Sequence, residues 1–253
     1  MKNWALILGA SSGFGAATAK KLASLGVNIY GVHLDRKSTM NQVDQLIKDL
    51  KDNNVEVVFK NVSATDESKR EEILQHLISI DANVKILMHS LAFGALRPVI
   101  DSDSCLSQKQ IEMTMDVMAN SIVYWAQDLF KNNILQKGGH IFGMTSSGGH
   151  RQWKSYGAVS AAKASLESYC RQLAFELSEQ NISSNAIQAG VTDTPALRKI
   201  PGNEIMIEHA LSNNPGKRLT TPDDVADVIS TLGLTDQTWL TGNTIRVDGG
   251  EDI

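Results

Sequence analysis

The sequence contains few cysteines and no long apolar run. Only two of its 253 residues are cysteines. Cys105 and Cys170 lack the spacing of a metal site, so we expect both to be reduced thiols that pack in the interior. No apolar run reaches the ~18 residues that a membrane span requires. The apolar stretch after Met1 is too short for a signal peptide, which predicts a cytoplasmic protein without a membrane partner.

The sequence also lacks an excess of basic residues. Its formal net charge is -4 and its isoelectric point is about 5.9, which argues against nucleic acid or a membrane surface as the default partner. Neither an internal repeat nor a low-complexity linker interrupts the chain. A hydrophobic content of 42% and a charged content of 21% are typical of a globular protein. The length allows one large α/β domain or two small ones.

A glycine-rich turn follows the first apolar run, residues 4–8. Residues 16–25 after the turn have the apolar periodicity of a helix, so the pattern is strand, turn, helix. Glycines in such a turn let the backbone approach a pyrophosphate, and free amides at the helix start give it partial positive charge. We therefore predict a dinucleotide site here rather than a plain tight turn. Its residues are Gly9, Ser11, Ser12, Gly13, Phe14 and Gly15.

The tip of the second apolar run, residues 27–34, bears on the choice of cofactor. An acidic residue at this tip binds the adenosine ribose of NAD and repels a 2′-phosphate, whereas basic residues pair with that phosphate. Asp35 therefore favours NADH, but Arg36 and Lys37 outnumber it, and His33 stands where the acid is more usual. NADPH is the predicted cofactor and NADH is the alternative. A solvated turn explains Lys37 equally well.

Helical and strand-like patterns continue to alternate along the rest of the chain. We predict helices at 42–51, 67–80, 111–132 and 155–180, and strands at 55–62, 84–88, 140–144, 182–188 and 244–247. Together with the first two strands these make seven. Strands that alternate with helices form parallel sheets with helices on both faces. The predicted fold class is α/β, a Rossmann-type doubly wound seven-stranded parallel sheet in a single domain, 1–253.

Small or polar residues follow several predicted strands, where an open parallel sheet places its ligand crevice. We expect Asn61 and Val62 to flank an adenine, with one polar contact and one apolar face. His89 has no carboxylate partner in a recognisable motif, so a packing role is favoured over a catalytic one. No metal site is predicted. Further cofactor-binding candidates, after the fourth and sixth strands, are Ser90, Leu91, Ala92, Gly190, Val191 and Thr192.

One tyrosine and one lysine lie seven positions apart in a segment of small residues. If the segment is helical, Tyr156 and Lys163 project from the same face with Cα atoms ~10 Å apart, so a phenol and an ammonium can flank one ligand. A lysine near a phenol favours the phenolate, which makes the phenol a usable proton donor or oxyanion partner. An ordinary helix with an incidental pair is the alternative. The position of the pair, after a serine-bearing strand end, favours an active site.

These features together resemble the short-chain dehydrogenase/reductase family. The resemblance covers residues 4–250 and includes the glycine turn, the hydroxyl-bearing strand end near Ser146, and a terminal Val-Asp-Gly-Gly. The commonest family pattern places the tyrosine four residues before the lysine, but that position is Val159, which cannot donate a proton. The longer spacing of Tyr156 and Lys163 resembles the divergent branch of enoyl-[acyl-carrier-protein] reductases.

Within that branch the chain looks most similar to the type III, NADPH-dependent enoyl reductases. The similarity lies in residues 89–94, 96–99 and 192–197. The usual catalytic serine of the wider family falls on Ser146 and is retained, whereas the commonest type of enoyl reductase has a second tyrosine there. The usual family asparagine falls on Met118, so a proton relay through that asparagine is not expected.

The resemblance implies reduction of the C2=C3 double bond of a trans-2-enoyl thioester, linked to acyl carrier protein or coenzyme A, in fatty-acid or related biosynthesis. In this reaction hydride goes to C3 while charge develops on the thioester oxygen, three bonds away. Moving a tyrosine three residues along a helix shifts it by ~4.5 Å, which has the right scale. Tyr156 is predicted to stabilise the enolate oxygen. Lys163 would bind the nicotinamide ribose, and Ser146 would orient the substrate or the tyrosine.

Residues 195–214 are predicted to form a lid over the acyl chain. The resemblance also implies a homotetramer. Two alternatives to enoyl reduction are a carbonyl reductase acting on 3-oxoacyl thioesters or other ketones, and a non-catalytic nicotinamide-binding regulatory protein. Basic residues that could meet an acidic carrier protein, or could equally be solvated surface charge, are Arg97, Arg151, Lys154, Arg198 and Lys199.

Overall fold

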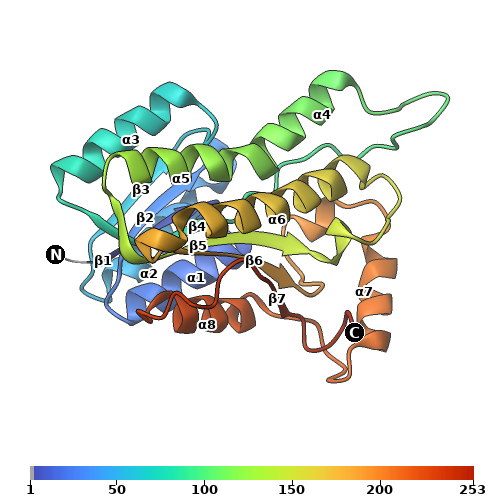
Figure 1. Cartoon of the computed structure of the whole chain (residues 1–253). Coiled ribbons are helices and arrows are strands. Elements are labelled where there is room, and N and C mark those ends of the chain that lie inside the picture. Colours follow the sequence, from blue (N-terminus) through green and yellow to red (C-terminus); the bar gives the residue numbers. More distant parts are fainter. Residues whose placement is uncertain (1–2) are drawn as a thin grey trace.

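Seven parallel strands form one sheet in the computed structural model, which describes residues 3–253 (Figure 1). Their order is β3-β2-β1-β4-β5-β6-β7, so the chain order reverses between β1 and β4. This confirms the predicted fold class, while residues 1 and 2 of the predicted domain lie outside the described residues. The strands are β1 (Asn3–Leu8), β2 (Asn28–His33), β3 (Val57–Asn61), β4 (Asn83–His89), β5 (Leu135–Ser146), β6 (Ser183–Ala189) and β7 (Thr244–Val247).

Helices cover both faces of the sheet because the central strands carry apolar side chains on both sides. One face packs against α3 (Glu67–Ser79), α5 (Ser121–Lys131) and α6 (Gly157–Leu177). The opposite face packs against α1 (Gly13–Ser24), α2 (Met40–Lys51) and α8 (Pro222–Gly233). Figure 1 shows these two helical layers with the sheet between them. Fully buried residues in the two layers include Leu77, Trp125 and Leu166, and Leu22, Leu50 and Ile229.

The helix predicted at 111–132 is instead a longer helical run with an irregular centre. It begins as α4 (Gln108–Met115), continues as a π-helical segment over Asp116–Asn120, and ends as α5. Ser107 caps its start through a reciprocal capping box with Gln110, a signal the apolar periodicity does not include. At the irregular centre, the Ser121 hydroxyl donates a hydrogen bond to the Val117 carbonyl at 2.8 Å. Side-chain hydrogen bonds of this kind compete with the regular helical pattern.

The predicted lid contains a short helix, α7 (Asn203–Asn213), that stands apart from the two helical layers (Figure 1). Both cysteines are free, as predicted, and Cys170 is buried. Cys105 is exposed on the long loop before α4, so the prediction that it packs in the interior is wrong. In the part of the chain that the structure describes, no helix has the length and apolarity needed to cross a membrane.

Candidate active site

The predicted site residues gather at the carboxyl edge of the sheet, on the right in Figure 1. Parallel pairing places Leu8 opposite His89, and Ser146 opposite Ala189, so the loops after β1, β4, β5 and β6 meet at this edge. The helix α7 and the C-terminus also lie there, whereas the N-terminus lies at the far edge. The arrangement matches the rule that open parallel sheets bind ligands beyond their carboxyl ends, where the strand order reverses.

The glycine turn has the geometry expected of a dinucleotide cradle. Gly9 has a φ of +88°, and a side chain there would collide with the carbonyl group of Ser90 in the neighbouring loop. Ser12 is the N-cap of α1, and its hydroxyl makes no capping hydrogen bond. The first amides of a helix have no partner within it, so those of α1 are available to bind an anion. This turn therefore fits the pyrophosphate of a dinucleotide.

The tip of β2 holds the Asp35 carboxylate in place. Its oxygens accept hydrogen bonds from the Thr39 hydroxyl at 3.0 Å and from the Ser11 hydroxyl, and one lies 2.9 Å from the His33 ring. Burial raises the pKa of Asp35, but these hydrogen bonds more than offset that effect, so its pKa lies below the usual value. Asp35 is therefore ionised beside the glycine turn. Arg36, by contrast, is exposed.

Asn61 supports the same strand tip. Its side chain accepts a hydrogen bond from the Asp35 amide at 2.9 Å and donates one to the Asp35 carbonyl at 3.0 Å. Val62 is partly buried against the core, as is Leu91 after β4. The sequence placed Asn61 beside an adenine, and the structure shows that its amide group already has two backbone partners. Its contact with a cofactor stays a prediction.

The loop after β6 is fastened to the C-terminal segment. The Gly190 amide donates to the Val247 carbonyl at 3.2 Å, and the Val191 amide donates to the Glu251 carboxylate at 3.0 Å. The Thr192 hydroxyl donates to the Gly190 carbonyl at 2.9 Å, so Thr192 stabilises the loop from within. Sequence reasoning did not include Glu251, although it directly follows the terminal Val-Asp-Gly-Gly that the resemblance used.

Tyr156 lies one residue before α6 rather than on it. Ser155 has a left-handed φ of 63°, which stops the helix from extending further back. The Tyr156 carbonyl accepts a helical hydrogen bond from the Ser160 amide at 2.8 Å. Because α6 then runs without interruption through Lys163, the phenol and the ammonium are still positioned by one rigid element.

Ser146 and Tyr156 are hydrogen-bonded through their side chains. The ring of Tyr156 packs so closely on Gly148 that a Cβ there would lie 2.5 Å from the ring. Burial raises the pKa of Tyr156, and the hydrogen bond with Ser146 opposes the rise. The sequence predicted that Lys163 would favour the phenolate, but in the structure burial dominates. The phenol is therefore protonated at neutral pH and can donate a hydrogen bond.

Lys163 is buried at the floor of the site. Its ammonium donates a hydrogen bond to the Met144 carbonyl at 2.6 Å. Burial lowers the pKa of Lys163 from 10.5 to about 8, while the nearby acidic groups of Glu167 and Cys170 act in the opposite direction. Sequence reasoning did not identify Glu167, which lies four residues after Lys163 and thus on the same helical face.

His89 has the packing role that the sequence favoured. It is fully buried, and its Nε2 lies 2.8 Å from the Ser121 hydroxyl. Burial, and then the charge of Lys163, lower the pKa of His89 to about 3, so the ring is neutral at working pH. Its Nδ1 has no hydrogen-bond partner in the described residues. In residues 3–253 no group of acidic, histidine or cysteine side chains could hold a metal ion.

The position that carries the tyrosine in the commonest family pattern is apolar. Val159 is buried with Met118, Ala119 and Ala162 in one small cluster. Met118 is the residue that the usual family asparagine aligns with, and it is buried in this cluster. Asn120, two residues on, accepts a hydrogen bond from the Tyr169 hydroxyl at 3.1 Å. Val159 and Met118 therefore supply no polar group beside Lys163.

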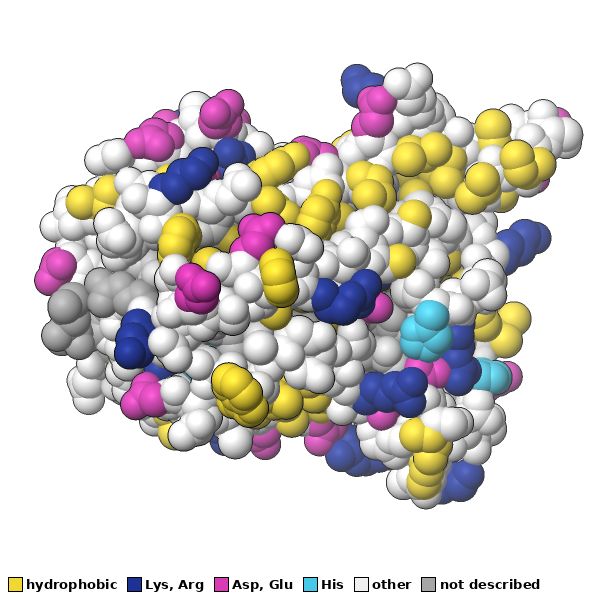
Figure 2. All heavy atoms as spheres, viewed as in Figure 1, with side chains coloured by type: hydrophobic (Ala, Val, Ile, Leu, Met, Phe, Trp, Pro, Cys, Tyr) yellow, Lys and Arg dark blue, Asp and Glu magenta, His cyan; other side chains and the backbone are white. Residues whose placement is uncertain are grey.

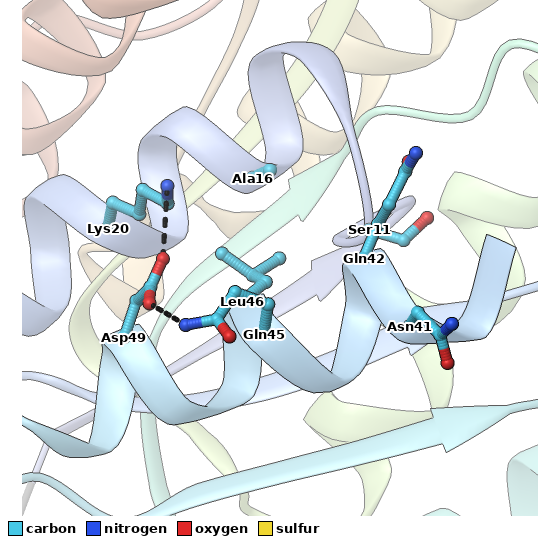
Figure 3. Close-up of a pocket in the computed structure, with 8 residues that line it drawn as sticks. All are labelled: Ser11, Ala16, Lys20, Asn41, Gln42, Gln45, Leu46 and Asp49. Carbon is cyan, nitrogen blue, oxygen red and sulfur yellow. Dashed lines mark hydrogen bonds and ion pairs between the residues drawn. The ribbon is translucent and has the colours of Figure 1, made fainter.

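A separate groove of about 420 Å³ lies between α1 and α2 (Figure 3). Most of the residues that line it have polar or charged side chains, and Figure 3 shows Asp49 paired with Lys20 and hydrogen-bonded to Gln45. Of the residues predicted for the cofactor, only Ser11 lines this groove. The groove therefore borders the cofactor side of the crevice and is separate from Tyr156 and Lys163.

Exposed apolar side chains lie beside the site, on the loop before α4. Figure 2 shows them gathered over α4 and the long loop that precedes it. Phe93, Val99 and Ile100 on this loop are exposed. Val99 packs directly against Gly157, next to Tyr156.

The doubly wound sheet, the glycine turn and the group formed by Ser146, Tyr156 and Lys163 define a Rossmann-type oxidoreductase.

Comparison with known proteins refines this class. A family model described as enoyl-(acyl carrier protein) reductase matches residues 9–251. The chain therefore belongs to the short-chain dehydrogenase/reductase family, in the group that this model describes. Members of the family bind a nicotinamide cofactor, and the glycine turn and the crevice described above fit one.

Individual relatives cover nearly the whole chain but differ in activity. A 3-oxoacyl-[acyl-carrier-protein] reductase of Buchnera aphidicola is 28% identical over 98% of this chain and 97% of its own. An NADH-dependent enoyl-[acyl-carrier-protein] reductase of Nostoc is 27% identical over 93% of this chain and 90% of its own. The structure of an NADH-dependent enoyl-[acyl-carrier-protein] reductase from Aquifex aeolicus superposes with a TM-score of 0.87 at 24% identity, covering 99% and 96% of the two chains.

Proposed function

We propose that the protein reduces the C2=C3 double bond of a trans-2-enoyl thioester, in fatty-acid or related biosynthesis. The observation that carries this proposal is the position of the phenol. Tyr156 precedes α6 and is hydrogen-bonded to Ser146, while the slot one turn before Lys163 holds buried Val159. An enzyme that protonates a ketone next to the hydride acceptor needs a hydroxyl close to that carbon, and Val159 supplies none.

A bound nicotinamide cofactor supplies the hydride that C3 of the substrate receives. The protonated Tyr156 phenol then donates a hydrogen bond to the thioester oxygen, on which negative charge develops, and the resulting enolate takes up a proton from solvent at C2. Lys163, held by the Met144 carbonyl at 2.6 Å, supplies positive charge beneath this oxygen and the ribose. Ser146 fixes the phenol through their shared hydrogen bond. Each residue acts from a position that the sheet edge and α6 fix before the substrate binds.

The direct test compares two acceptors by the absorbance of the reduced nicotinamide. We expect oxidation with crotonyl thioester and little with acetoacetyl thioester. Tyr156→Phe should lower turnover about 100-fold or more, because one donor to the oxyanion is lost, with cofactor affinity nearly unchanged. Tyr169→Phe, on α6 but bonded to Asn120, is the matched control and should be near wild type. Oxidation with acetoacetyl thioester alone would instead establish a carbonyl reductase, the alternative that the Buchnera relative supports.

The choice between the two nicotinamide cofactors depends on Asp35 and Arg36. The exposed Arg36 supports the predicted NADPH, since a guanidinium pairs well with a 2′-phosphate. Asp35 opposes it, because an ionised carboxylate fixed beside Ser11 accepts from a ribose hydroxyl and repels that phosphate. We expect the fixed carboxylate to have the larger effect, with NADH preferred and NADPH the alternative. Asp35→Asn should then raise the kcat/KM ratio of NADPH to NADH at least about tenfold, and an unchanged ratio would favour Arg36 as the determinant.

An acidic carrier protein is the proposed partner for the basic residues at the mouth of the site. Two of the five already have acidic partners: Arg198 pairs with Asp193 at 2.7 Å, and Arg151 pairs with Asp252. Arg97, Lys154 and Lys199 are exposed and free of ion pairs within residues 3–253, so these three carry the proposal.

Charge reversal at Lys199 tests the carrier proposal. Lys199→Glu should raise KM severalfold for a carrier-linked substrate and have a clearly smaller effect on a coenzyme A-linked one, since the carrier presents a whole acidic surface to the basic residues. Lys131→Glu, at the far end of α5, is the matched control. Equal effects of Lys199→Glu on both substrates would exclude the carrier. The lid role of residues 195–214 and a homotetramer are part of the same proposal, and light scattering in solution tests the latter.

A further inference from the structure

A carboxylate lies beside the proposed active site without a role in the chemistry described above. Glu167 is on α6, one helical turn after Lys163, and is half-buried. Its Oε1 accepts a hydrogen bond from the Thr145 hydroxyl at 2.6 Å. A side chain at Gly149 would lie 2.7 Å from the same oxygen. The carboxylate is therefore enclosed between α6, the end of β5 and the loop that follows Ser146.

Within residues 3–253, Glu167 is the only carboxylate whose charge acts on the Lys163 ammonium. Its hydrogen-bond acceptor, the Met144 carbonyl, is uncharged. His89 on β4 is neutral at working pH, and Cys170 on α6 is a buried thiol whose pKa burial raises to about 12. Among the described residues, Glu167 is thus the group whose negative charge acts on Lys163 at neutral pH. No direct ion pair joins the two within residues 3–253, so the interaction acts through space.

We propose that Glu167 is a positioning residue that keeps the Lys163 ammonium charged during turnover. The inference rests on the proposed function, in which that charge sits beneath the developing enolate. A buried lysine loses its proton readily because burial disfavours the charged form. The hydrogen bond from Thr145 holds the carboxylate at a fixed distance from the ammonium, and the half-buried setting makes its field stronger than that of a surface charge.

The pH profile of activity distinguishes this role from a purely structural one. Glu167→Gln keeps the shape and the Thr145 hydrogen bond but removes the charge. We expect kcat/KM for crotonyl thioester to be within about twofold of wild type at pH 6 and about fivefold lower at pH 8, because the basic limb moves about one pH unit lower. A uniform loss at every pH, or an unchanged profile, would overturn the proposal. Glu176→Gln, an exposed carboxylate on the same helix, is the matched control and should not move the limb.

A second measurement does not depend on turnover. Urea unfolding from pH 6 to pH 10 reports the titration of Lys163, because a lysine with a lowered pKa makes the folded state more stable as the pH rises. In Glu167→Gln this rise should begin about one pH unit lower than in wild type. Crotonyl thioester could fail as a substrate while the rise in stability still begins at a lower pH in Glu167→Gln. The proposed function would then fail and the role of Glu167 would stand. If the rise does not move, the role of Glu167 is refuted whatever the substrate.

Discussion

Replacing Lys163 with methionine should make the stability of the protein less dependent on pH while removing its activity. Lys163 carries a charge in a buried position, where its pKa falls from 10.5 to about 8. At 1.36 kcal/mol per pKa unit, this shift costs the folded state about 3 kcal/mol when the side chain is protonated. Because the folded pKa is the lower one, the cost is fully present below pH 8. It disappears as the pH rises from about 8 to 10.5.

The assay is urea unfolding of wild type and Lys163→Met at pH 7 and pH 9.5. The free energy of unfolding of the variant minus that of wild type should fall by about 2 kcal/mol between pH 7 and pH 9.5. The absolute difference is less informative, because methionine leaves the Met144 carbonyl without a donor. Tyr30 and Cys170, whose pKa values burial raises to about 12, are present in both proteins, so the comparison largely removes their contributions.

Lys199→Met, which removes an exposed charge instead, is the matched control and should differ equally from wild type at both pH values. If Lys163→Met also shows the same difference at pH 7 and pH 9.5, Lys163 titrates as it does in water. The account of a buried ammonium in the active site would then be refuted. Activity should be lost in this variant at every pH, since methionine offers neither charge nor a hydrogen bond.

Two further substitutions test the packing around and behind the site. Gly148→Ala would place a methyl group 2.5 Å from the Tyr156 ring, so the phenol must move. Turnover of crotonyl thioester should therefore fall about 100-fold. Near-wild-type turnover would show that the position of the phenol is not critical. Trp125, fully buried in α5, donates a hydrogen bond from Nε1 to the Ala64 carbonyl at 2.9 Å. Trp125→Phe should lower the free energy of unfolding by about 2 kcal/mol in urea titrations and leave kcat unchanged. A change below about 0.5 kcal/mol would exclude this hydrogen bond as a stabilising contact.

The position of Tyr156 shows how far local sequence can predict a site. The spacing to Lys163 was informative because the small residues between them form an unbroken helix. The left-handed conformation of Ser155, just before the N-terminus of this helix, was not predictable. A serine adopts that conformation only where the surrounding loop imposes it. The pKa direction of Tyr156 also could not be derived from spacing, since burial depends on the loops that pack over the ring.

The sequence by itself determined the order of strands and helices, the glycine turn and the pair formed by Tyr156 and Lys163, because periodicity, turn residues and helical spacing are local properties. Only the tertiary structure decided which charged groups lie beside the glycine turn and beside that pair. Asp35 meets Ser11, and Glu167 meets Thr145, across contacts between segments distant in sequence. Such contacts, and the burial that lowers the pKa of Lys163, exist only once the carboxyl ends of the strands have come together at one edge of the sheet.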